Sequence, residues 1–473
     1  MVTPGQYTDN FLHTIYPDPG TIGDLATRDH VAMMLLTHEK AMGKITSYPF
    51  KLQGGQGHAA RRVDSQAITS QGTGLGAAQG GRSVVGEWLV TNGDYTDTVV
   101  IRDKDSEEGD ASNEASYLRN VVMETDGLIE EFGEVFETYL MSFGGGVAAG
   151  AGVRQPKSLG RATQAGIGAV GVITLDTPED AHNFQLGMAI IAIQETDATV
   201  VLGTGAIGAG AGGSVFWVVG VDTEAGTITT GLNQGDATPG VTATAWDGVA
   251  NAIQIFRYGD YSNTTSGSSV AAGTNSSGST TGVYIIDGFQ DWITPTSQPG
   301  TKFNVSRNVD SRLTGVRLST AKSVGSIENR ILQLGTEIQI TSGNKGPLKV
   351  VINSRQWTKL VGELKSRGIT PHESTVKGAT TSFGYSAIYV DLPQGRSEVI
   401  PSPHVQATIC IMLNMKSWHF CATKGMFPRV MNGDGLRLLR KAQSDDYEFR
   451  TTCYAHLACQ YPSWNGRATL AAV

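Results

Sequence analysis

The sequence predicts an α+β fold built from several domains. Three observations predict it: a long helical periodicity from Ser112 to Phe143, a block of short strand-like runs from Val170 to Tyr261, and mixed helices and strands after Val283. The chain has 473 residues. At ~100–200 residues per domain, this length corresponds to about two to four domains.

The first part of the chain is predicted to contain an arm, a helix and a hairpin. The arm is polar to about Thr21, and a helix follows from Asp24 to Met42. Two strands, Ile45–Leu52 and Ser83–Asn92, flank a tract at Gln53–Gly81 that is mostly Gly, Gln, Ala, Ser and Thr. Because compact domains rarely contain unstructured loops of about 20 residues, this tract is either a functional loop or a disordered surface loop without a partner.

The helix predicted from Ser112 to Phe143 is the clearest single element. Its apolar residues recur three or four positions apart, as they do on a helix with one face in a core. At ~1.5 Å per residue the helix would span about 50 Å, and it ends at Gly144-Gly145-Gly146. The apolar stripe consists of Leu118, Val121, Val122, Leu128, Ile129, Phe132, Val135, Phe136, Tyr139, Leu140 and Phe143.

Residues Val170 to Tyr261 are predicted to form a small barrel or sandwich. Glycine-rich joints separate its short apolar runs. A polar tract from Ser262 to Gly282 follows as a linker or an exposed loop. The predicted strands are Val170–Leu175, Met188–Gln194, Thr199–Leu202, Val215–Val221 and Ile253–Tyr258.

The same block contains a GxGxxG pattern from Gly203 to Gly208, and Asp222 ends the following strand. A dinucleotide site needs a helix that begins at the glycines and directs its N-terminus at the pyrophosphate. Only Ala209–Ser214 separates the pattern from the next strand, and this segment is too short and too rich in Gly for such a helix. A nucleotide-binding enzyme is therefore the weaker alternative, and no cofactor is predicted.

Mixed structure resumes after Val283. Two helices are predicted from the apolar faces within Ile327–Ile338 and Trp357–Leu364. Gly368 ends the second helix, and a buried strand, Leu348–Asn353, lies between the two.

The C-terminal part resembles a known family. Two strand-like runs, Ala407–Ala422 and Tyr447–Cys459, lie on either side of a Gly-rich turn, and the chain then closes on Trp464-Asn465-Gly466-Arg467. Upstream, a strand ends in Asn353 and a helix begins with Ser354-Arg-Gln-Trp357. This arrangement resembles the major capsid proteins of tailed bacteriophages, which have the Hong Kong 97 (HK97) fold.

The resemblance covers roughly Ile45 to Gly150 and Tyr284 to Arg467, and it implies an HK97-like division of the chain. The implied parts are an N-terminal arm and helix (1–44), an extended β-hairpin loop (45–105), a peripheral domain with a long spine helix (106–169), an inserted β-rich domain and linker (170–282), an axial domain (283–405), and C-terminal return strands of the peripheral domain (406–473).

The resemblance implies a structural protein of the virion rather than an enzyme. Such a subunit self-assembles in the host cytoplasm into hexamers and pentamers, which close into an icosahedral shell around double-stranded DNA, with a portal at one vertex. A separate scaffolding protein is expected, because the arm before Asp24 is too short for a scaffolding segment. A decoration or cement protein is a further candidate partner. The alternative with the same fold is an encapsulin-like nanocompartment, which is typically shorter and lacks the inserted domain.

Composition and charge limit the partners. Only 17% of residues are charged and 60 are Gly, which suits a surface covered by partners but equally an extracellular β-rich protein. The net charge of −8 opposes binding of nucleic acid by counterion release. Packaged DNA is therefore expected without sequence-specific binding. No apolar run approaches the ~18 residues of a membrane span, so no membrane partner is expected.

No catalytic or metal-ligating residue is predicted. His419 and Cys421 share a strand face near Cys453 and His456, but their spacing matches no paired zinc pattern, so core packing is preferred. Some members of the family crosslink through a lysine of the extended loop. The tract from Gln53 to Asp103 has no Lys, so shells without isopeptide bonds are expected. The cysteines expected as buried free thiols are Cys410, Cys421, Cys453 and Cys459.

Opposite charges occur on the long helix and on the hairpin loop. We hypothesise that the loop arginines of one subunit lie over the acidic outer face of its neighbour's helix; the alternative is that both are solvated faces. Each exposed pair contributes only ~0–1 kcal/mol, so the pairs would set register and repetition would supply strength. The acidic residues are Glu130, Glu131, Glu134 and Glu137, and the arginines are Arg61, Arg62 and Arg82.

Overall fold

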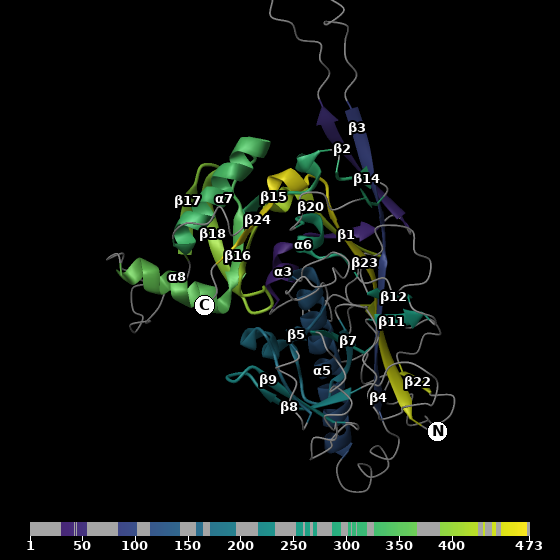
Figure 1. The fold of residues 1–473 in the computed structure, drawn as a ribbon. Helices are drawn as coiled ribbons and strands as arrows, with labels where there is room; N and C mark the ends of the chain where they lie inside the picture. Colours follow the sequence, from purple (N-terminus) through teal and green to yellow (C-terminus); the bar gives the residue numbers. More distant parts are fainter. Residues whose placement is uncertain are drawn as a thin grey trace, which may run out of the picture.

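The computed structural model is a mixed α and β molecule in which the described residues form three six-stranded sheets (Figure 1). No helix in this part of the chain is long and apolar enough to cross a membrane. The described residues are 30–41, 43, 45–53, 84–101, 114–141, 158–163, 171–194, 216–231, 252–258, 261–264, 268–271, 286–294, 301–303, 305–308, 310–318, 326–366, 388–423, 429–430, 438–440 and 446–470.

The first sheet is organised around β23 (Tyr447–Cys459), which matches the predicted strand. On one side β23 pairs antiparallel with β4 along nine residues of each strand, and on the other with β20, β21 and β22 in turn. With 13 residues, β23 is long enough to pair with several shorter strands along its length. The other strands are β1 (His38–Ala41), β4 (Gly93–Ile101), β20 (Trp418–Thr423), β21 (Arg429–Val430) and β22 (Leu438–Arg440).

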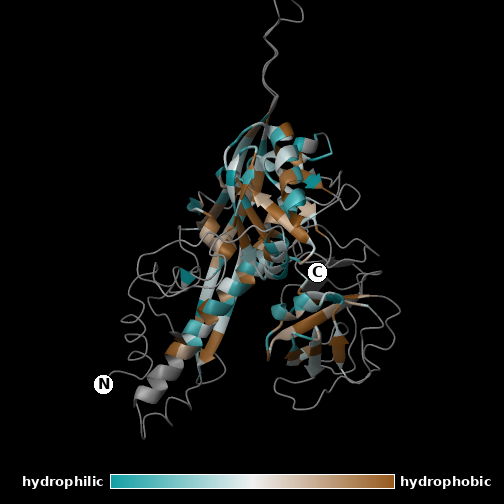
Figure 2. Ribbon diagram, turned by 90° about the vertical axis from the view of Figure 1, so that its left-hand side faces the viewer, coloured by the Kyte–Doolittle hydropathy of each residue, from teal (hydrophilic) through white to brown (hydrophobic). Residues whose placement is uncertain are grey.

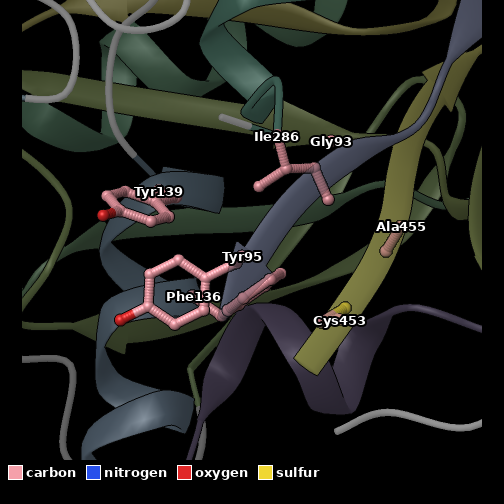
Figure 3. Close-up of a pocket in the computed structure, with 7 residues that line it drawn as sticks. All are labelled: Gly93, Tyr95, Phe136, Tyr139, Ile286, Cys453 and Ala455. Carbon is pink, nitrogen blue, oxygen red and sulfur yellow. The ribbon is translucent and has the colours of Figure 1, made fainter. Parts of the chain in front are cut away.

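The predicted long helix is confirmed as α5 (Glu114–Met141), and it packs on the first sheet. Phe132 and Phe136 place their rings edge-on against Tyr95 of β4, with centroids 4.9 and 5.5 Å away. Figure 2 shows polar and apolar segments alternating along this helix, as expected when one face lies in a core. A small cavity remains at the contact, lined by Gly93, Tyr95, Phe136, Tyr139, Ile286, Cys453 and Ala455 (Figure 3).

The two strands predicted before the long helix are confirmed. β2 (Ile45–Gln53) and β3 (Val84–Thr91) pair antiparallel and lead away from the rest of the molecule (Figure 1). The predicted loop between them lies outside the described residues. One face of this hairpin belongs to the same apolar cluster as α5 and the first sheet.

The block after the long helix forms a barrel, one of the two predicted architectures. Its strand order is β5-β10-β7-β8-β9-β6. The N–H of Asp176, just after β6, donates to the carbonyl of Arg161 in β5 at 2.8 Å, so the two end strands meet. An apolar cluster that includes Phe184, Phe216 and Ile255 fills the interior. The elements are β5 (Gly160–Ala162), β6 (Val172–Thr174), η4 (Pro178–Asn183), β7 (Ala189–Gln194), β8 (Phe216–Asp222), β9 (Thr227–Gly231) and β10 (Ile253–Arg257).

Asp222, which suggested a nucleotide site, has a local structural role. Its Oδ1 accepts the backbone N–H of Glu224 at 3.0 Å and of Ala225 at 2.9 Å, which closes the turn between β8 and β9. The GxGxxG pattern and the predicted strand Thr199–Leu202 lie outside the described residues.

The third sheet separates two apolar clusters. Its order is β15-β24-β19-β16-β18-β17. Val350 and Ile352 of β16 face the cluster of the predicted helices α7 and α8, whereas Val351 faces the cluster of α5 and the first sheet, because strand side chains alternate. The elements are β15 (Val316–Leu318), α7 (Ile327–Ser342), β16 (Lys349–Asn353), α8 (Ser354–Ser366), β17 (Ile388–Leu392), β18 (Gly395–Ser402), β19 (Ile409–Leu413) and β24 (Gly466–Thr469).

Short elements complete the described chain. They are β11 (Tyr261–Thr264), β12 (Ser268–Ala271), α6 (Phe289–Trp292), β13 (Thr301–Lys302), β14 (Val305–Ser306), η6 (Ser311–Leu313), η8 (Met415–Ser417) and η9 (Pro462–Trp464). β11 and β12 form a two-stranded hairpin at the start of the tract that was predicted as a linker or an exposed loop.

The structure corrects two expectations. The helix predicted to run to Met42 ends earlier: α3 spans Val31–Leu35, and His38–Ala41 forms β1 because it gains ladder hydrogen bonds in parallel with β20. The run Ala407–Ala422 does not return to one sheet. η8 divides it, so that β19 joins the third sheet and β20 joins the first.

Candidate assembly site

The hairpin of β2 and β3 is rooted in the core by one face only. Its buried side chains are Tyr48, Phe50, Trp88 and Val90. On the other face Ile45 is 56% exposed and Val85 is 62% exposed. The alternation of strand side chains thus divides the hairpin into an anchored face and a free face.

Aromatic rings connect the hairpin root to the segment around α6. Trp88 stands edge-on to Trp292 with centroids 5.2 Å apart, and Phe50 lies 4.8 Å from Trp88. Trp292 Nε1 donates to the carbonyl of Leu457 in β23 at 3.1 Å. Gly86 is opposite Phe50, and a Cβ at Gly86 would lie 2.6 Å from that ring. The glycine therefore provides the space in which the Phe50 ring packs.

A polar cluster fastens the same root to the first sheet. The Tyr48 hydroxyl lies 2.7 Å from His456 Nε2 and 3.0 Å from Cys421 Sγ. Beside it, His419 Nδ1 lies 3.0 Å from Glu39 Oε1. Burial lowers the pKa of His456 to about 4, and burial, followed by the bond to Cys421, raises the pKa of Tyr48. The central hydrogen bond therefore joins two uncharged groups at neutral pH.

The structure separates Cys453 from the other residues that suggested a zinc site. Cys453 lines the cavity on the α5 side of β23 together with Tyr95, whereas His456, three residues later, points to the hairpin side. The Tyr48 hydroxyl bridges Cys421 and His456. Within the described ranges no three ligand-type side chains are placed to hold a metal ion. All four cysteines are buried and free, as predicted.

The acidic face of α5 is engaged within its own chain. Arg257 of β10 donates from Nη1 to Glu131 Oε1 at 2.9 Å, and Gln185 donates to Glu134. Both partners come from the barrel domain. Two of the four predicted contact residues therefore fasten the barrel to α5, while Glu130 is exposed.

Carboxylates crowd this junction between the barrel and α5. Burial raises the pKa of Asp97 on β4, and the charge of Glu131 raises it further. Burial also raises the pKa of Glu134, and Arg257 partly offsets both shifts. The guanidinium group of Arg257 thus interacts with three carboxylates, one on β4 (Asp97) and two on α5 (Glu131 and Glu134).

Glu137 does not lie on the outer face, contrary to the prediction. It is 1% exposed, and its two oxygens accept the N–H of Ala32 at 2.8 and 3.0 Å. The hydroxyl of Ser402 donates to Oε1 at 3.4 Å. One carboxylate of α5 therefore holds both α3 and the end of β18, and burial raises its pKa to about 7. The adjacent Thr138 hydroxyl lies 3.2 Å from His404 Nδ1 and reinforces the same joint.

The predicted arginines Arg61, Arg62 and Arg82 lie outside the described residues, so the contact between subunits stays a prediction. Of its proposed acidic partners, Glu130 is exposed, and the side chain of Glu131 is 43% exposed while paired with Arg257.

Sequence reasoning missed the residues that root the hairpin. The alternation within Ile45–Leu52 puts Tyr48 and Phe50 on one face, and that signal could have identified them as anchors. Glu39 could not be found in this way, because the helical expectation for its segment was wrong.

Phage capsid proteins are among the solved structures to which the chain is similar. The cyanophage A-1(L) capsid asymmetric unit is 9% identical, with 93% of this chain and 92% of that chain covered and a TM-score of 0.46. The capsid of a native GTA particle is 7% identical, with 95% of this chain and 91% of that chain covered and a TM-score of 0.40. An encapsulin complex from Synechococcus elongatus is 12% identical over 39% of this chain and 56% of that chain, with a TM-score of 0.24. These likenesses are distant. No family model and no curated protein matches the chain.

Proposed function

We propose that this chain is the major capsid protein of a tailed bacteriophage. In this proposal the subunit forms hexamers and pentamers that close into an icosahedral shell around double-stranded DNA. A separate scaffolding protein assists assembly, a portal occupies one vertex, and a decoration or cement protein is a further partner. The hairpin serves as the extended loop, α5 as the spine helix, and the third sheet with α7 and α8 as the body of the axial domain.

The main support for the proposal is that only one face of the hairpin is buried in the core. An isolated two-stranded hairpin is at best marginally stable in water. Here Tyr48, Phe50 and Trp88 are buried in the core of the molecule, while Ile45 and Val85 remain in solvent on the opposite face. A neighbouring subunit that covered this free face would gain about 25 cal/mol per Å² of apolar surface removed from water. The buried face would hold the hairpin in position while the exposed face contacts the neighbouring subunit.

Electron microscopy of the expressed and fractionated protein tests the proposal. Closed shells or ring-shaped capsomers are expected, alone or with a scaffolding protein. A chain that stays monomeric under both conditions contradicts the proposal, and particles that enclose an enzyme cargo instead of DNA favour the encapsulin-like alternative. Val85→Asp should block assembly without lowering the unfolding temperature of the subunit, because Val85 is 62% exposed. Val85→Thr, which keeps the shape without adding charge, is the matched control.

The absence of Lys from Gln53 to Asp103 leads to a second measurement. Subunits of mature particles should separate completely in denaturing electrophoresis and migrate as one monomer band. A ladder of multiples would show that covalent crosslinks form through other residues.

A further inference from the structure

A row of polar side chains crosses three strands of the first sheet beneath the hairpin. Glu39 of β1 pairs with Cys421 of β20, and Cys421 pairs with His456 of β23. Residues that pair directly across strands project from the same face of a sheet, so these three side chains lie together. The Tyr48 hydroxyl of β2 lies over the row, 3.0 Å from Cys421 Sγ and 2.7 Å from His456 Nε2. A side chain of the hairpin therefore covers a polar row that belongs to the sheet.

Asn92, which directly follows β3, makes a second contact with the same histidine. Its Nδ2 donates to the carbonyl of Gly43 at 3.1 Å, so its Oδ1 is the atom that lies 2.6 Å from His456 Nδ1. An amide oxygen can only accept, so Nδ1 of His456 carries the ring proton. In the neutral ring Nε2 is then an acceptor, and the Tyr48 hydroxyl donates to it. Both ring nitrogens of His456 are thus bound by the hairpin and its end, in an arrangement that fits a neutral ring.

A second proton on His456 would oppose this arrangement. Nε2 would become a donor, and the Tyr48 hydroxyl would have to turn and donate to Cys421 Sγ, a weak acceptor. The new charge would also be buried, because His456 is only 2% exposed. Burial lowers the pKa of His456 to about 4; the charge of Glu39 opposes this shift and that of His419 adds to it. Among the described residues, the titratable groups that face His456 are Glu39, Tyr48, His419 and Cys421.

We propose that His456 is a pH-sensitive switch for the hairpin: the neutral ring holds Tyr48 and Asn92, and protonation favours a state in which the hairpin root lifts from the sheet. In the lifted state the ring meets water and can take up a proton without burying the charge. Acid therefore favours this state, as a ligand favours the conformation to which it binds. The hairpin is suited to local opening because only one of its faces is buried.

The size of the effect follows from the change in the pKa of His456. The ring has its ordinary pKa of 6.5 in the lifted state and a pKa of about 4 in the closed state. One site with these two values makes the ratio of lifted to closed subunits about 30-fold higher at pH 5 than at pH 8. The closed state is held fully above pH 6.5, and this hold is lost as the pH falls to about 4.

Labelling of Cys421 in the unassembled subunit measures how often the hairpin root lifts. Cys421 is 3% exposed and lies against Tyr48, so a reagent reaches its thiol only when the hairpin moves away. A pyridyl disulfide, which reacts with thiols in mild acid, is the reagent, and mass spectrometry of peptides locates the label. His456→Gln stays polar but does not titrate, so the reagent's own pH dependence cancels when wild type is divided by this variant. The ratio should rise about 30-fold from pH 8 to pH 5.

Two controls accompany this measurement. His182→Gln makes the same substitution at an exposed position of the barrel, and its labelling should follow wild type. Cys410 is fully buried in the third sheet, so it should stay unlabelled while Cys421 reacts. The rate of a small free thiol, measured at each pH, corrects the wild-type profile without any variant, which keeps the test valid if His456→Gln does not fold.

Three results would overturn the proposal. They are a corrected wild-type rate that does not rise in acid, a rise that His456→Gln keeps, and labelling of Cys410 as fast as that of Cys421, which would indicate global unfolding. The measurement uses the single subunit, so its outcome is independent of the proposed capsid role.

Discussion

Replacing Glu137 with Gln would remove a buried negative charge while keeping the shape of the side chain and one acceptor oxygen. In the structure Glu137 is 1% exposed, and its carboxylate is bound by the backbone of Ala32 and the hydroxyl of Ser402. Burial raises its pKa from 4.5 to about 7. The folded state therefore holds this proton more tightly than the unfolded state. The resulting stabilisation is complete below pH 4.5 and is lost as the pH rises through about 7.

The expected size of the effect on the free energy of unfolding follows from this pKa. At about 1.36 kcal/mol per pH unit, a change from 4.5 to about 7 corresponds to about 3 kcal/mol. Glutamine does not titrate, so the stability of Glu137→Gln relative to wild type should increase by roughly this amount between about pH 4 and pH 8. The other titrating groups are the same in both proteins, and their contributions largely cancel in the difference.

Unfolding midpoints measured at closely spaced pH values provide the assay. The curve for Glu137→Gln should approach that of wild type in acid and lie above it in alkaline solution. Glu130→Gln is the matched control, because Glu130 is exposed on the same helix and its curve should run parallel to wild type. Parallel curves for Glu137→Gln and wild type would refute the assignment of a buried, proton-binding carboxylate.

Two further predictions concern the root of the hairpin. Gly86→Ala should lower stability by about 1–3 kcal/mol, because the new Cβ would lie 2.6 Å from the packed ring of Phe50; Gly43→Ala, with nothing within 4 Å of the new Cβ, is its control in chemical denaturation. Tyr48→Phe should cost about 1–3 kcal/mol, since it leaves the buried His456 without its 2.7 Å partner, and an unchanged denaturation midpoint would show that water replaces the hydroxyl.

Local periodicity was sufficient to locate the regular elements. The spacing of apolar residues identified α5 (Glu114–Met141) and β23 (Tyr447–Cys459), and alternation identified the strands of the hairpin and most strands of the barrel. These patterns arise within one turn or one strand, so a short window of sequence contains the whole signal. The same reasoning failed at His38–Ala41, where pairing with a strand nearly 400 residues later decided the conformation.

Helical spacing is enough to predict that acidic residues share one side of α5, but the role of each carboxylate depends on which distant segments pack against it. Glu137 meets Ala32 and Ser402, which are 105 and 265 residues away, and Glu131 meets Arg257, 126 residues away. A helical pattern states which residues share a face, but it contains no information about which distant segments cover that face. Ala32, Ser402 and Arg257 come from three different parts of the fold. Much of the helix face that was predicted to contact a neighbouring subunit therefore makes contacts within its own subunit.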